Sequence, residues 1–431
     1  MKNISVVGAG HVGLVTAACL ADLGNKVIAT DDDTKKIEHL KKGLMPFYEP
    51  GLDEIVHRNT DSGRLFFTTS IREGIRASEI IFICVGTPQK QTGEADISNV
   101  ESVTKRIGEL LDSHKAIVEK STVPVRTGSW IRKTINVNTK RNVDFDVVCN
   151  PEFMREGSAI HDFMHPDRII LGVETERAAN TMIRLYKRLN APVIVTNIET
   201  AELIKHASNS FLALKVSYIN AIARICEKVG ADVKKVAEGA GYDKRIGREY
   251  LNAGAGYGGY CLPKDLSAFI KIAEEIGYDF ELLKAVQKVN NEQRDQIAAK
   301  AKKALWNLNG KVIGILGLSF KPDTDDMREA PSIYIIKKLQ EEGAIIKAYD
   351  PQAMNNAKAI LANIKYCKDP YQLAKGCDAI IVTSAWEEFR ELDLLKIKRL
   401  LRQPVIIDGS NIYNPEDVRS LGFVYEGVGR C

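Results

Sequence analysis

The chain has 431 residues, of which 45% are hydrophobic and 27% charged, and its formal net charge is +4. This is the composition of an ordinary globular protein, and the length predicts two to four domains. Acidic and basic residues are mixed along the chain, which argues against a nucleic-acid or membrane-surface protein. No apolar run approaches the roughly 20 residues that span a bilayer.

The eight cysteines form no CxxC pair and no regular framework. Several lie within apolar strand or helix patterns, so we expect reduced thiols and a cytoplasmic protein. The sequence opens directly on a strand pattern, and we therefore expect no signal peptide. The cysteines are Cys19, Cys84, Cys149, Cys226, Cys261, Cys367, Cys377 and Cys431.

The first predicted elements form a βαβ unit with a glycine motif. A strand over 2–7 precedes the motif GAGHVG at 8–13, a helix over 14–23 and a strand over 26–30. Glycines at these spacings allow a tight turn and close approach of the backbone to a dinucleotide pyrophosphate. Asp31 is placed to bind the ribose hydroxyls, and its carboxylate would repel a 2′-phosphate, which favours NAD over NADP. The residues expected to contact NAD are Gly8, Gly10, Val12, Gly13 and Asp31.

A glycine turn without a ligand is the alternative, and the agreement of strands, helix and acid argues against it. Three further strands are predicted over 79–85, 115–119 and 145–149, and each ends in a polar loop. Ligands of open α/β sheets bind at the carboxyl ends of strands. Side chains in these loops are therefore expected to face the cofactor or the substrate, unless they serve as turn residues or helix caps. They are Thr87, Thr122 and Glu152.

A long helix is predicted over 199–230 because apolar residues recur along it at helical spacing. Such a helix between two α/β halves commonly links domains and packs against a partner subunit. Lys205 and Asn209 stand four residues apart and therefore share one face. Without further support, the pattern favours a solvated polar stripe for this pair.

A glycine-rich run over 252–260 leads into Cys261, and a helical pattern follows. Pro263 suits a first helical turn. A helix N-terminus and the nearby Lys264 would both favour a thiolate, so Cys261 is a candidate nucleophile. Asp265 follows four residues later. The alternative is a buried cysteine beside a linker loop.

The C-terminal part repeats the organisation of the first. Strands are predicted over 311–317, 344–349 and 377–383, with a helix over 332–340. A full glycine motif is absent, and the polar loop over 320–328 suits a different nucleotide-like ligand. A degenerate structural domain is the alternative.

The pattern as a whole predicts an α/β protein of two Rossmann-like domains with parallel sheets, joined by a long central helix and a helical middle domain. The predicted boundaries are 1–198, 199–300 and 301–431. His161 and His165 stand four apart, but no third metal ligand clusters with them, so we expect no metal site.

Several segments together resemble the UDP-glucose/GDP-mannose dehydrogenases over essentially the whole chain. The resemblance implies two Rossmann-like domains, and a central helix that forms a dimer interface. The matching segments are Gly8–Gly13, Tyr48–Leu52, Val85–Pro88, Glu119–Pro124, Asn150–Phe153, Ala201–Asn209, Gly256–Asp265 and Phe320–Lys321.

The resemblance implies a double oxidation, in which a sugar-nucleotide alcohol becomes a carboxylate and two NAD are reduced. UDP-glucose is the expected substrate and UDP-glucuronate the product. Cys261 matches a nucleophile that carries a thiohemiacetal and then a thioester. Lys205 and Asn209 match a pair that binds the reacting oxygen. Asp265 resembles a carboxylate that works with a water as base, and Glu152 and Thr122 help to position the hydrolytic water.

The family also implies binding residues. Contacts to NAD are expected from Asp31, Lys36, Thr87, Thr122, Glu156, Lys264 and Arg328. Contacts to the nucleotide sugar are expected from Glu152, Phe153, Lys205, Asn209, Tyr250, Gly258, Phe320 and Lys321. Arg245 resembles an arginine that the family donates across a homodimer.

One departure is Ser410, which stands where the family often has an arginine. GDP-mannose or a UDP-N-acetylhexosamine is therefore an alternative substrate. A catalytically silent sugar-nucleotide sensor and a single-oxidation hydroxy-acid dehydrogenase are alternatives of other classes. The intact nucleophile and its neighbours argue against both.

Overall fold

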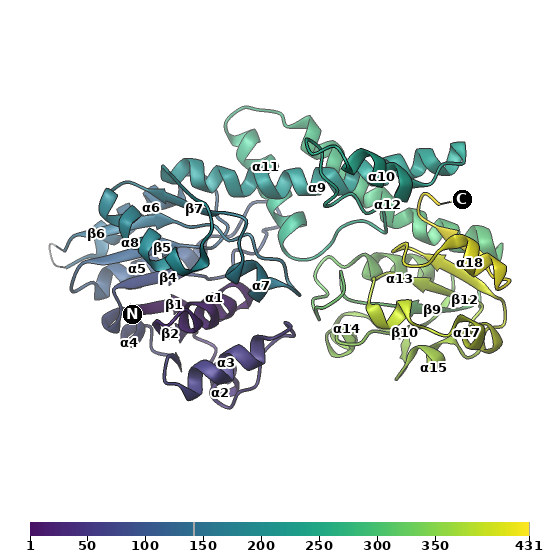
Figure 1. The fold of residues 1–431 in the computed structure, drawn as a ribbon, viewed down its shortest axis with the longest axis horizontal. Helices are drawn as coiled ribbons and strands as arrows, with labels where there is room; N and C mark the ends of the chain where they lie inside the picture. The colour runs from purple at the N-terminus through teal and green to yellow at the C-terminus, as the bar shows by residue number, and fades with distance from the viewer. Residues whose placement is uncertain (141–142, 431) are drawn as a thin grey trace. The chain divides into compact units, whose positions relative to one another are not determined.

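The computed structural model describes residues 1–140 and 143–430. The chain forms two compact units, and each contains one β-sheet (Figure 1). The first unit comprises Met1–Ser208 with Ser267–Gly277, and the second comprises Asn209–Leu266 with Tyr278–Cys431. The proposed domain boundaries after residues 198 and 300 remain a prediction.

The sheet of the first unit has eight strands in the order β3-β2-β1-β4-β5-β6-β7-β8. All neighbours are parallel except β6 and β7, which pair antiparallel. The first six strands therefore follow the order of a dinucleotide-binding fold. The strands are β1 (Asn3–Val7), β2 (Lys26–Thr30), β3 (Leu65–Thr68), β4 (Ile80–Ile83), β5 (Lys115–Glu119), β6 (Phe145–Cys149), β7 (Ile169–Val173) and β8 (Val193–Thr196).

Helices pack on both faces of this sheet, because its central strands are apolar on both sides. In β4, Ile80 and Phe82 point into one core, whereas Ile81 and Ile83 point into the other. The first core includes α1 (His11–Asp22), α2 (Thr34–Lys41), α3 (Leu52–Asp61), α7 (Ala159–Met164) and α8 (Glu176–Tyr186), which is followed by the short 3-10 helix η1 (Lys187–Leu189). The second includes α4 (Ile71–Ala77), α5 (Ser98–Leu110), α6 (Thr127–Asn138) and the start of α9 (Ile198–Val229).

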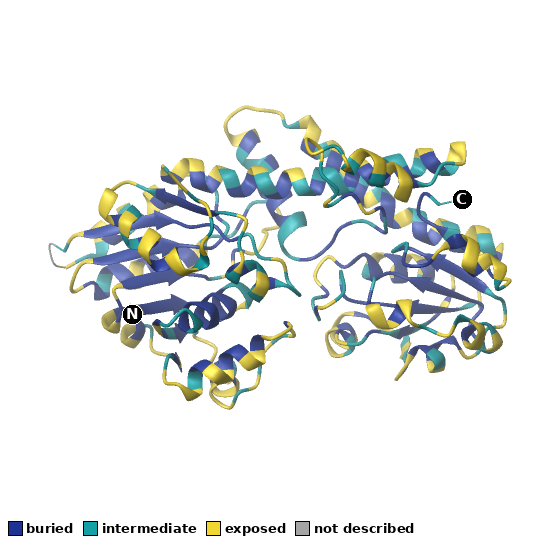
Figure 2. Cartoon of the chain, viewed as in Figure 1, coloured by how far each residue is buried: buried dark blue, intermediate teal, exposed yellow. Residues whose placement is uncertain are grey.

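The second unit contains a six-stranded, fully parallel sheet in the order β11-β10-β9-β12-β13-β14. This is the strand order of the first six strands of the other unit. Strands β9, β12 and β13 in the interior of this sheet are dark blue in Figure 2, which marks them as buried. They are β9 (Val312–Leu316), β10 (Ile345–Tyr349), β11 (Ile364–Tyr366), β12 (Ala379–Val382), β13 (Val405–Asp408) and β14 (Val424–Gly427).

Helices cover both faces of this second sheet as well. One core contains the end of α9 together with α10 (Val233–Gly241), α12 (Glu281–Leu305), α13 (Pro331–Glu341) and α14 (Met354–Ile360). The other contains α15 (Pro370–Ala374), α16 (Glu387–Arg390), α17 (Leu394–Leu400) and α18 (Pro415–Ser420). The remaining helix, α11 (Cys261–Glu275), begins directly after the glycine-rich run.

The structure confirms the predicted fold class, and the strands predicted over 26–30, 115–119 and 145–149 match β2, β5 and β6. The sequence interpretation did not include β3, β7, β8, β11, β13 or β14. In β8 the middle residues Ile194 and Val195 are about half exposed, so this strand lacks the buried apolar run that is typical of a central strand. Helix α11 begins at Cys261, so the structure confirms the prediction that this cysteine lies at a helix N-terminus.

Among the described residues, seven cysteines are free thiols, whereas Cys431 lies outside the described part. No group of three or more His, Cys, Asp or Glu side chains within residues 1–140 and 143–430 could hold a metal ion. His161 and His165 contact each other through their rings, with centroids 5.0 Å apart. None of the helices in the described part is long and apolar enough to span a bilayer.

Candidate active site

The glycine motif of the first unit forms a tight turn between β1 and α1. Gly8 has φ +99° and donates a backbone hydrogen bond to Thr30 O at 2.8 Å. A Cβ there would lie 2.6 Å from Cys84 O, and a Cβ at Gly13 would lie 1.8 Å from the oxygen of the first glycine. Among the described residues, apart from Gly10 itself and its neighbours in the chain, no atom lies within 4 Å of a Cβ built at Gly10. Gly8 and Gly13 thus allow close packing of the backbone, and Gly10 between them leaves its backbone open to a ligand.

Asp31 lies at the end of β2 and points to the glycine motif. Its Oδ2 accepts hydrogen bonds from Ala9 N at 2.8 Å and from Lys36 Nζ at 2.9 Å. Its Oδ1 accepts from Asp33 N at 3.0 Å. The carboxylate therefore stands beside the turn, where the sequence predicted a ribose-binding acid, and the structure brings the predicted lysine to it. These residues fit an NAD molecule that lacks a 2′-phosphate.

The loops after β4, β5 and β6 bring three predicted side chains to one edge of the sheet, since these strands are neighbours. Thr87 is buried and donates through its hydroxyl to Thr122 O at 2.8 Å. Glu152 follows β6, and Oε2 of its side chain accepts from Met154 N at 2.7 Å. The first two loops are thus tied together directly, and the third lies on the next strand.

Lys205 and Glu152 form a buried ion pair in the first unit. The lysine ammonium donates to Glu152 Oε1 at 3.0 Å and to the same residue's carbonyl oxygen at 2.7 Å. Both side chains are about 5% exposed or less. Because this ion pair is buried, Lys205 does not belong to a solvated polar stripe of α9. A buried lysine presents its charge in a water-poor site, where it acts strongly on a substrate oxygen.

Two further cations lie near this pair. The Arg168 guanidinium stacks 3.7 Å from the centre of the Phe153 ring, and Lys205 Nζ lies 5.2 Å from the same ring. Lys120 is buried, and its ammonium donates to Asn150 Oδ1 at 3.3 Å. Burial lowers the pKa of Lys120. Sequence reasoning did not single out Lys120, because a lysine at a strand end gives no sign of burial.

Two side chains of α9 fasten this helix to the loop after β5. Glu202 accepts hydrogen bonds from Arg126 N at 2.6 Å and Gly128 N at 2.8 Å, so it caps the start of α6. Burial raises the pKa of Glu202 to about 7. His206 donates from Nε2 to Val123 O at 2.8 Å. Neither contact has a local sequence signal, because the partners lie over 70 residues away in the chain.

In the second unit, α12 holds the glycine-rich run in place. Asn290 Oδ1 accepts from Tyr257 N at 2.8 Å, and its Nδ2 donates to Tyr257 O at 3.0 Å. Gln293 Nε2 donates to Gly254 O at 3.0 Å. These amides replace the backbone partners that the run would have in a helix or strand. These hydrogen bonds therefore help to fix the loop before the candidate nucleophile.

The glycines of this run also permit close contact with the polar loop after β9. A Cβ at Gly258 would lie 2.3 Å from Glu329 O, and one at Gly259 would lie 2.7 Å from the Phe320 ring. Gly259 N donates to Arg328 O at 2.9 Å. The two loops that the sequence assigned to a nucleotide sugar thus pack backbone to backbone.

Cys261 is half-buried, whereas the other described cysteines are buried. Its position at the first residue of a 15-residue helix favours a thiolate. Lys264 donates to Asp265 Oδ1 at 2.6 Å, so much of the lysine's charge is matched by that carboxylate rather than by the sulfur. Asn209 Nδ2 donates to Asp265 Oδ2 at 2.6 Å, and all three polar side chains are buried. Asn209 is therefore not part of a solvated polar stripe either.

The remaining predicted residues of the second unit are more exposed. The Arg328 guanidinium lies 4.1 Å from the Tyr260 ring centre and pairs with Asp326. Lys321 Nζ lies 5.7 Å from the centre of the Phe320 ring. These cations surround the polar loop after β9, where charges of this sign suit phosphate groups.

Three further positions from the sequence analysis are Arg245, Tyr250 and Ser410. The Arg245 side chain is 89% exposed and pairs with Asp243 two residues away. Tyr250 adopts φ +63°, a conformation uncommon outside glycine. Ser410 donates its backbone N–H to Asp408 Oδ1 at 3.2 Å, and its short side chain cannot supply the charge of an arginine.

Family models match the chain in three consecutive parts. Residues 2–190 match the NAD binding domain of the UDP-glucose/GDP-mannose dehydrogenase family, and residues 199–292 match its central domain. Residues 314–415 match its UDP binding domain.

Full-length relatives are similar as well. The chain is 49% identical over 431 residues to UDP-glucose 6-dehydrogenase TuaD of Bacillus subtilis, covering 100% of this chain and 94% of the relative. It is 43% identical over 435 residues to UDP-glucose 6-dehydrogenase of Rhizobium meliloti, covering 99% of each.

Solved structures share the fold over the full length. A UDP-glucose dehydrogenase from Pyrobaculum islandicum superposes with a TM-score of 0.94 at 38% identity, covering 100% of this chain and 98% of the other. A UDP-D-ManNAc dehydrogenase from Pyrococcus horikoshii superposes with a TM-score of 0.87 at 27% identity, covering 99% of each.

Proposed function

Because this chain belongs to the UDP-glucose/GDP-mannose dehydrogenase family, we propose that it is an NAD-dependent UDP-glucose 6-dehydrogenase that oxidises UDP-glucose twice to UDP-glucuronate. The observation that carries the proposal is the half-buried Cys261 at the start of α11, one helical turn from the buried Asp265. A single oxidation of an alcohol needs no such nucleophile, whereas the passage from aldehyde to carboxylate benefits from one.

The residues of the first unit fit NAD. Gly10 leaves its backbone open at the start of α1, where free N–H groups suit a diphosphate, and Asp31 stands ready for the ribose. Thr87 and Thr122 line the edge of the sheet beside them. When bound, NAD accepts a hydride in each of the two oxidations.

The first oxidation needs a base for the alcohol proton and donors for the oxygen. Lys205 and Asn209 lie one turn apart on α9. Lys205 donates a hydrogen bond to Glu152, and Asn209 donates one to Asp265. We assign both donors to the sugar C6 oxygen, which they stabilise as negative charge develops. Asp265, through a water, takes the proton.

The second oxidation proceeds on the cysteine. The Cys261 sulfur adds to the aldehyde carbon, a C–S bond forms, and the oxygen takes up a proton to give a thiohemiacetal. Its oxidation gives a thioester, which keeps the reactive aldehyde from escaping. Glu152 and Thr122 position the water that attacks the thioester carbon, and the thiolate leaves as the carboxylate forms.

The sugar nucleotide is assigned to the packed loops of the second unit and to Phe153. Its expected contacts are Phe153, Tyr250, Gly258, Phe320 and Lys321. The cations near the loop after β9 suit the diphosphate. Ser410 favours a second candidate, a related nucleotide sugar such as GDP-mannose or a UDP-N-acetylhexosamine, because it lacks the charge of the arginine common at this place.

We further propose a homodimer. Phe211, Tyr218, Ile225 and Val229 follow one face of α9 at spacings of seven, seven and four, and each is at least 55% exposed. An apolar stripe of this length is typical of a surface that another chain covers. Arg245, whose side chain is exposed, would then reach the substrate of the partner subunit. Sedimentation of the wild type and of a Phe211→Glu/Tyr218→Glu variant tests the dimer. A cytoplasmic location remains a prediction from cysteine usage.

One assay separates the candidate functions. The purified chain is incubated with NAD and a panel of nucleotide sugars, and the NADH formed per sugar is counted. Two NADH per UDP-glucose is the expected result. Two per another sugar supports the second candidate, one per sugar supports a single oxidation, and none with any sugar supports a silent sensor.

The cysteine mechanism has its own test. Cys261→Ser should lower formation of the carboxylate by at least about 10³-fold, or trap the sugar at the aldehyde level. Cys226→Ser is the matched control, because Cys226 is buried on the far part of α9 and carries no assigned role. Unchanged turnover in Cys261→Ser would exclude the thioester route and leave the fold assignment intact.

A further inference from the structure

His11 occupies a position inside the glycine motif that the proposed mechanism does not use. It is the first residue of α1, and its Nε2 lies 2.8 Å from Oε2 of Glu49. Its ring packs against Phe47, with centroids 4.9 Å apart. The histidine side chain is 18% exposed, whereas that of Glu49 is fully buried. A titratable ring thus stands at the helix N-terminus where the dinucleotide diphosphate is expected.

Glu49 determines which ring nitrogen carries the proton. Its Oε2 also accepts from Gly157 N at 2.7 Å, and its Oε1 accepts from Ala159 N at 2.8 Å. A carboxylate only accepts, so Nε2 of His11 must donate to it. In the neutral ring, Nδ1 then carries a lone pair, whereas in the imidazolium it carries a proton.

The protonation state therefore decides how Nδ1 meets an anion. Within residues 1–140 and 143–430, no protein group hydrogen-bonds to Nδ1 of His11. A lone pair repels a phosphate oxygen, whereas an N–H donates to it and adds a positive charge. The open Cβ position at the preceding Gly10 shows that a ligand can approach the backbone next to the ring.

The groups around His11 are acidic. Glu49 comes from the loop before α3, and Glu152 and Glu156 come from the loop after β6. Burial lowers the pKa of His11, but the hydrogen bond to Glu49 and the charges of Glu156, Glu49 and Glu152 outweigh it, so the net shift is upward. These carboxylates would repel a diphosphate, and a protonated ring offsets that repulsion.

We propose that the imidazolium of His11, held by Glu49, binds the diphosphate of the dinucleotide at the start of α1 and makes cofactor affinity depend on pH. The inference rests on the proposed use of NAD, and it adds a binding residue that the glycine motif alone does not supply. Affinity is highest when the ring is protonated and falls as pH rises through the pKa of the ring.

The test measures binding by calorimetry on the full-length chain between pH 5.5 and 9. ADP-ribose is the probe, because it carries the diphosphate without the reactive ring, and adenosine is the probe without phosphate. Wild-type affinity for ADP-ribose should fall about ten-fold across this range, as expected for one charge-assisted hydrogen bond. Adenosine affinity should stay flat.

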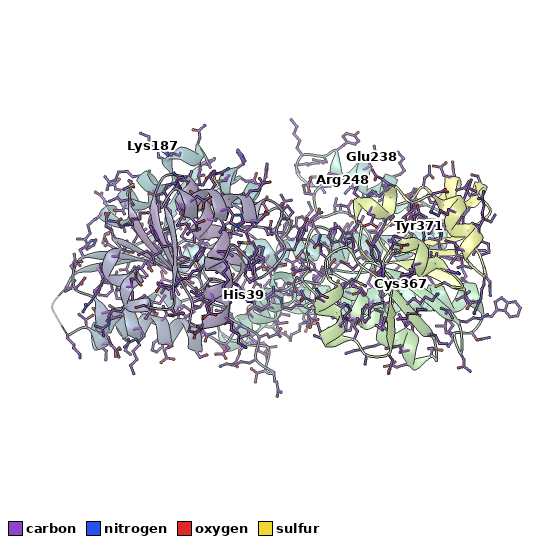
Figure 3. All side chains as sticks on the ribbon, turned by 90° about the horizontal axis from the view of Figure 1, so that it is seen from below. His39, Lys187, Glu238, Arg248, Cys367 and Tyr371 are labelled. Carbon is purple, nitrogen blue, oxygen red and sulfur yellow. The ribbon has the colours of Figure 1, made fainter. Side chains whose placement is uncertain are left out.

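His11→Gln keeps a donor for Glu49 but cannot take up a proton. Its affinity for ADP-ribose should be independent of pH and equal to the wild-type value at high pH. His39→Gln is the control, since His39 lies exposed on α2 (Figure 3) and should leave the wild-type profile unchanged. An unchanged pH dependence in His11→Gln overturns the proposal.

A second measurement needs no variant that alters the site. Histidine resonances of the wild type, followed by NMR, should show the pKa of His11 rising when ADP-ribose saturates the protein, because linkage is reciprocal. A pKa that stays constant or falls overturns the inference about His11, while NAD binding and turnover would still stand. Failure of the wild type to bind either NAD or ADP-ribose at any pH refutes both this inference and the proposed function.

Discussion

The two units build the same turn from different sequences. In each sheet the first strand of the unit lies between two parallel neighbours, and a glycine follows that strand in both units. Gly8 and Gly317 adopt φ +99° and +94°, and each donates its N–H to the last residue of the next strand, Thr30 and Tyr349, at 2.8 and 2.9 Å. The strand order therefore imposes the first step of the turn, whatever ligand each unit serves.

The units differ at the acid that follows the second strand. Asp31 keeps a side chain 9% exposed and pairs with Lys36. Asp350 is 1% exposed, and backbone N–H groups from both neighbouring loops saturate its oxygens. The donors are Leu318 N, Ser319 N, Gln352 N and Ala353 N. The acid thus serves the fold in the second unit, whereas in the first unit it pairs with a lysine beside the glycine motif, where we propose that it binds the ribose.

Removing Asp350, the acid of the second unit, should have the largest effect on the free energy of unfolding. Asp350→Ala leaves buried backbone donors without partners, and each such loss costs about 1–3 kcal/mol. We expect the free energy of unfolding of the second unit to fall by about 4 kcal/mol, measured by urea titration. Asp31→Ala is the reference, with a smaller loss of about 1–2 kcal/mol, because Ala9 N is the donor of a buried residue that loses its acceptor. Equal losses in the two variants would contradict the contrast between the acids.

A second contrast concerns buried acids of the first unit that accept fewer hydrogen bonds than Asp350 does. In the first unit, Glu119 Oε1 has no hydrogen-bond partner among the described residues, and burial raises the pKa of Glu119 and Glu202. Glu202 keeps its proton in the folded state up to about pH 7, whereas the unfolded chain ionises near 4.5. Stability should therefore fall by about 3 kcal/mol as pH rises between these values, and then level off.

Urea unfolding at pH 5 and pH 7.5 tests this slope. Glu202→Gln should be less stable at pH 5, because one backbone donor loses its acceptor, and its own contribution to the pH slope should vanish. Glu199→Gln, three residues earlier and exposed, should keep the wild-type slope. A wild-type slope in Glu202→Gln would show that this carboxyl group does not titrate in the window.

Alanine at the shared glycines sharpens the comparison. Gly8→Ala and Gly317→Ala should each cost about 2 kcal/mol, because φ is positive and the new Cβ would meet atoms at 2.6 Å in both units. Gly10→Ala should leave stability nearly unchanged but weaken NAD binding, since its φ is −77° and its Cβ would face open space. Thermal unfolding and calorimetric titration separate the two outcomes.

The smallest expected effect is on cofactor choice. Asp31→Ala should weaken NAD affinity about ten-fold, or about 1.4 kcal/mol, because the ribose loses an acceptor. Affinity for NADP should not fall, since the repulsion of a 2′-phosphate disappears. The neighbouring Asp32→Ala, an exposed position, is the control and should change neither value.

Much of the fold was predictable because its signals are local. The strand over 26–30 carries an apolar run that ends at an acid, and the glycine motif before α1 repeats a known spacing. The edge strand β8 was not predictable, since its exposed middle residues break that pattern. The start of α11 at Cys261 agrees with the sequence, in which Pro263 suits a first helical turn.

The candidate site divides in the same way. Cys261 at the start of a helix could be expected from the sequence, because the glycine run, the proline and the helical pattern lie side by side. The state of Lys205 could not, since four-residue spacing fits a solvated face as well as a buried one. Its burial against Glu152 became visible only in the structure, because the two residues are 53 positions apart in the chain.

The sequence by itself determined the order of the two Rossmann-like halves, the glycine turn and the candidate nucleophile, because each depends on neighbouring residues. Only the tertiary structure decided which polar side chains stabilise the fold by accepting hydrogen bonds from the backbone. Asp350 and Glu202 bind backbone groups far from them in the chain, whereas Asp31 keeps a partly exposed side chain. The physical reason is that the availability of a charged group depends on the donors around it, and these come from other elements.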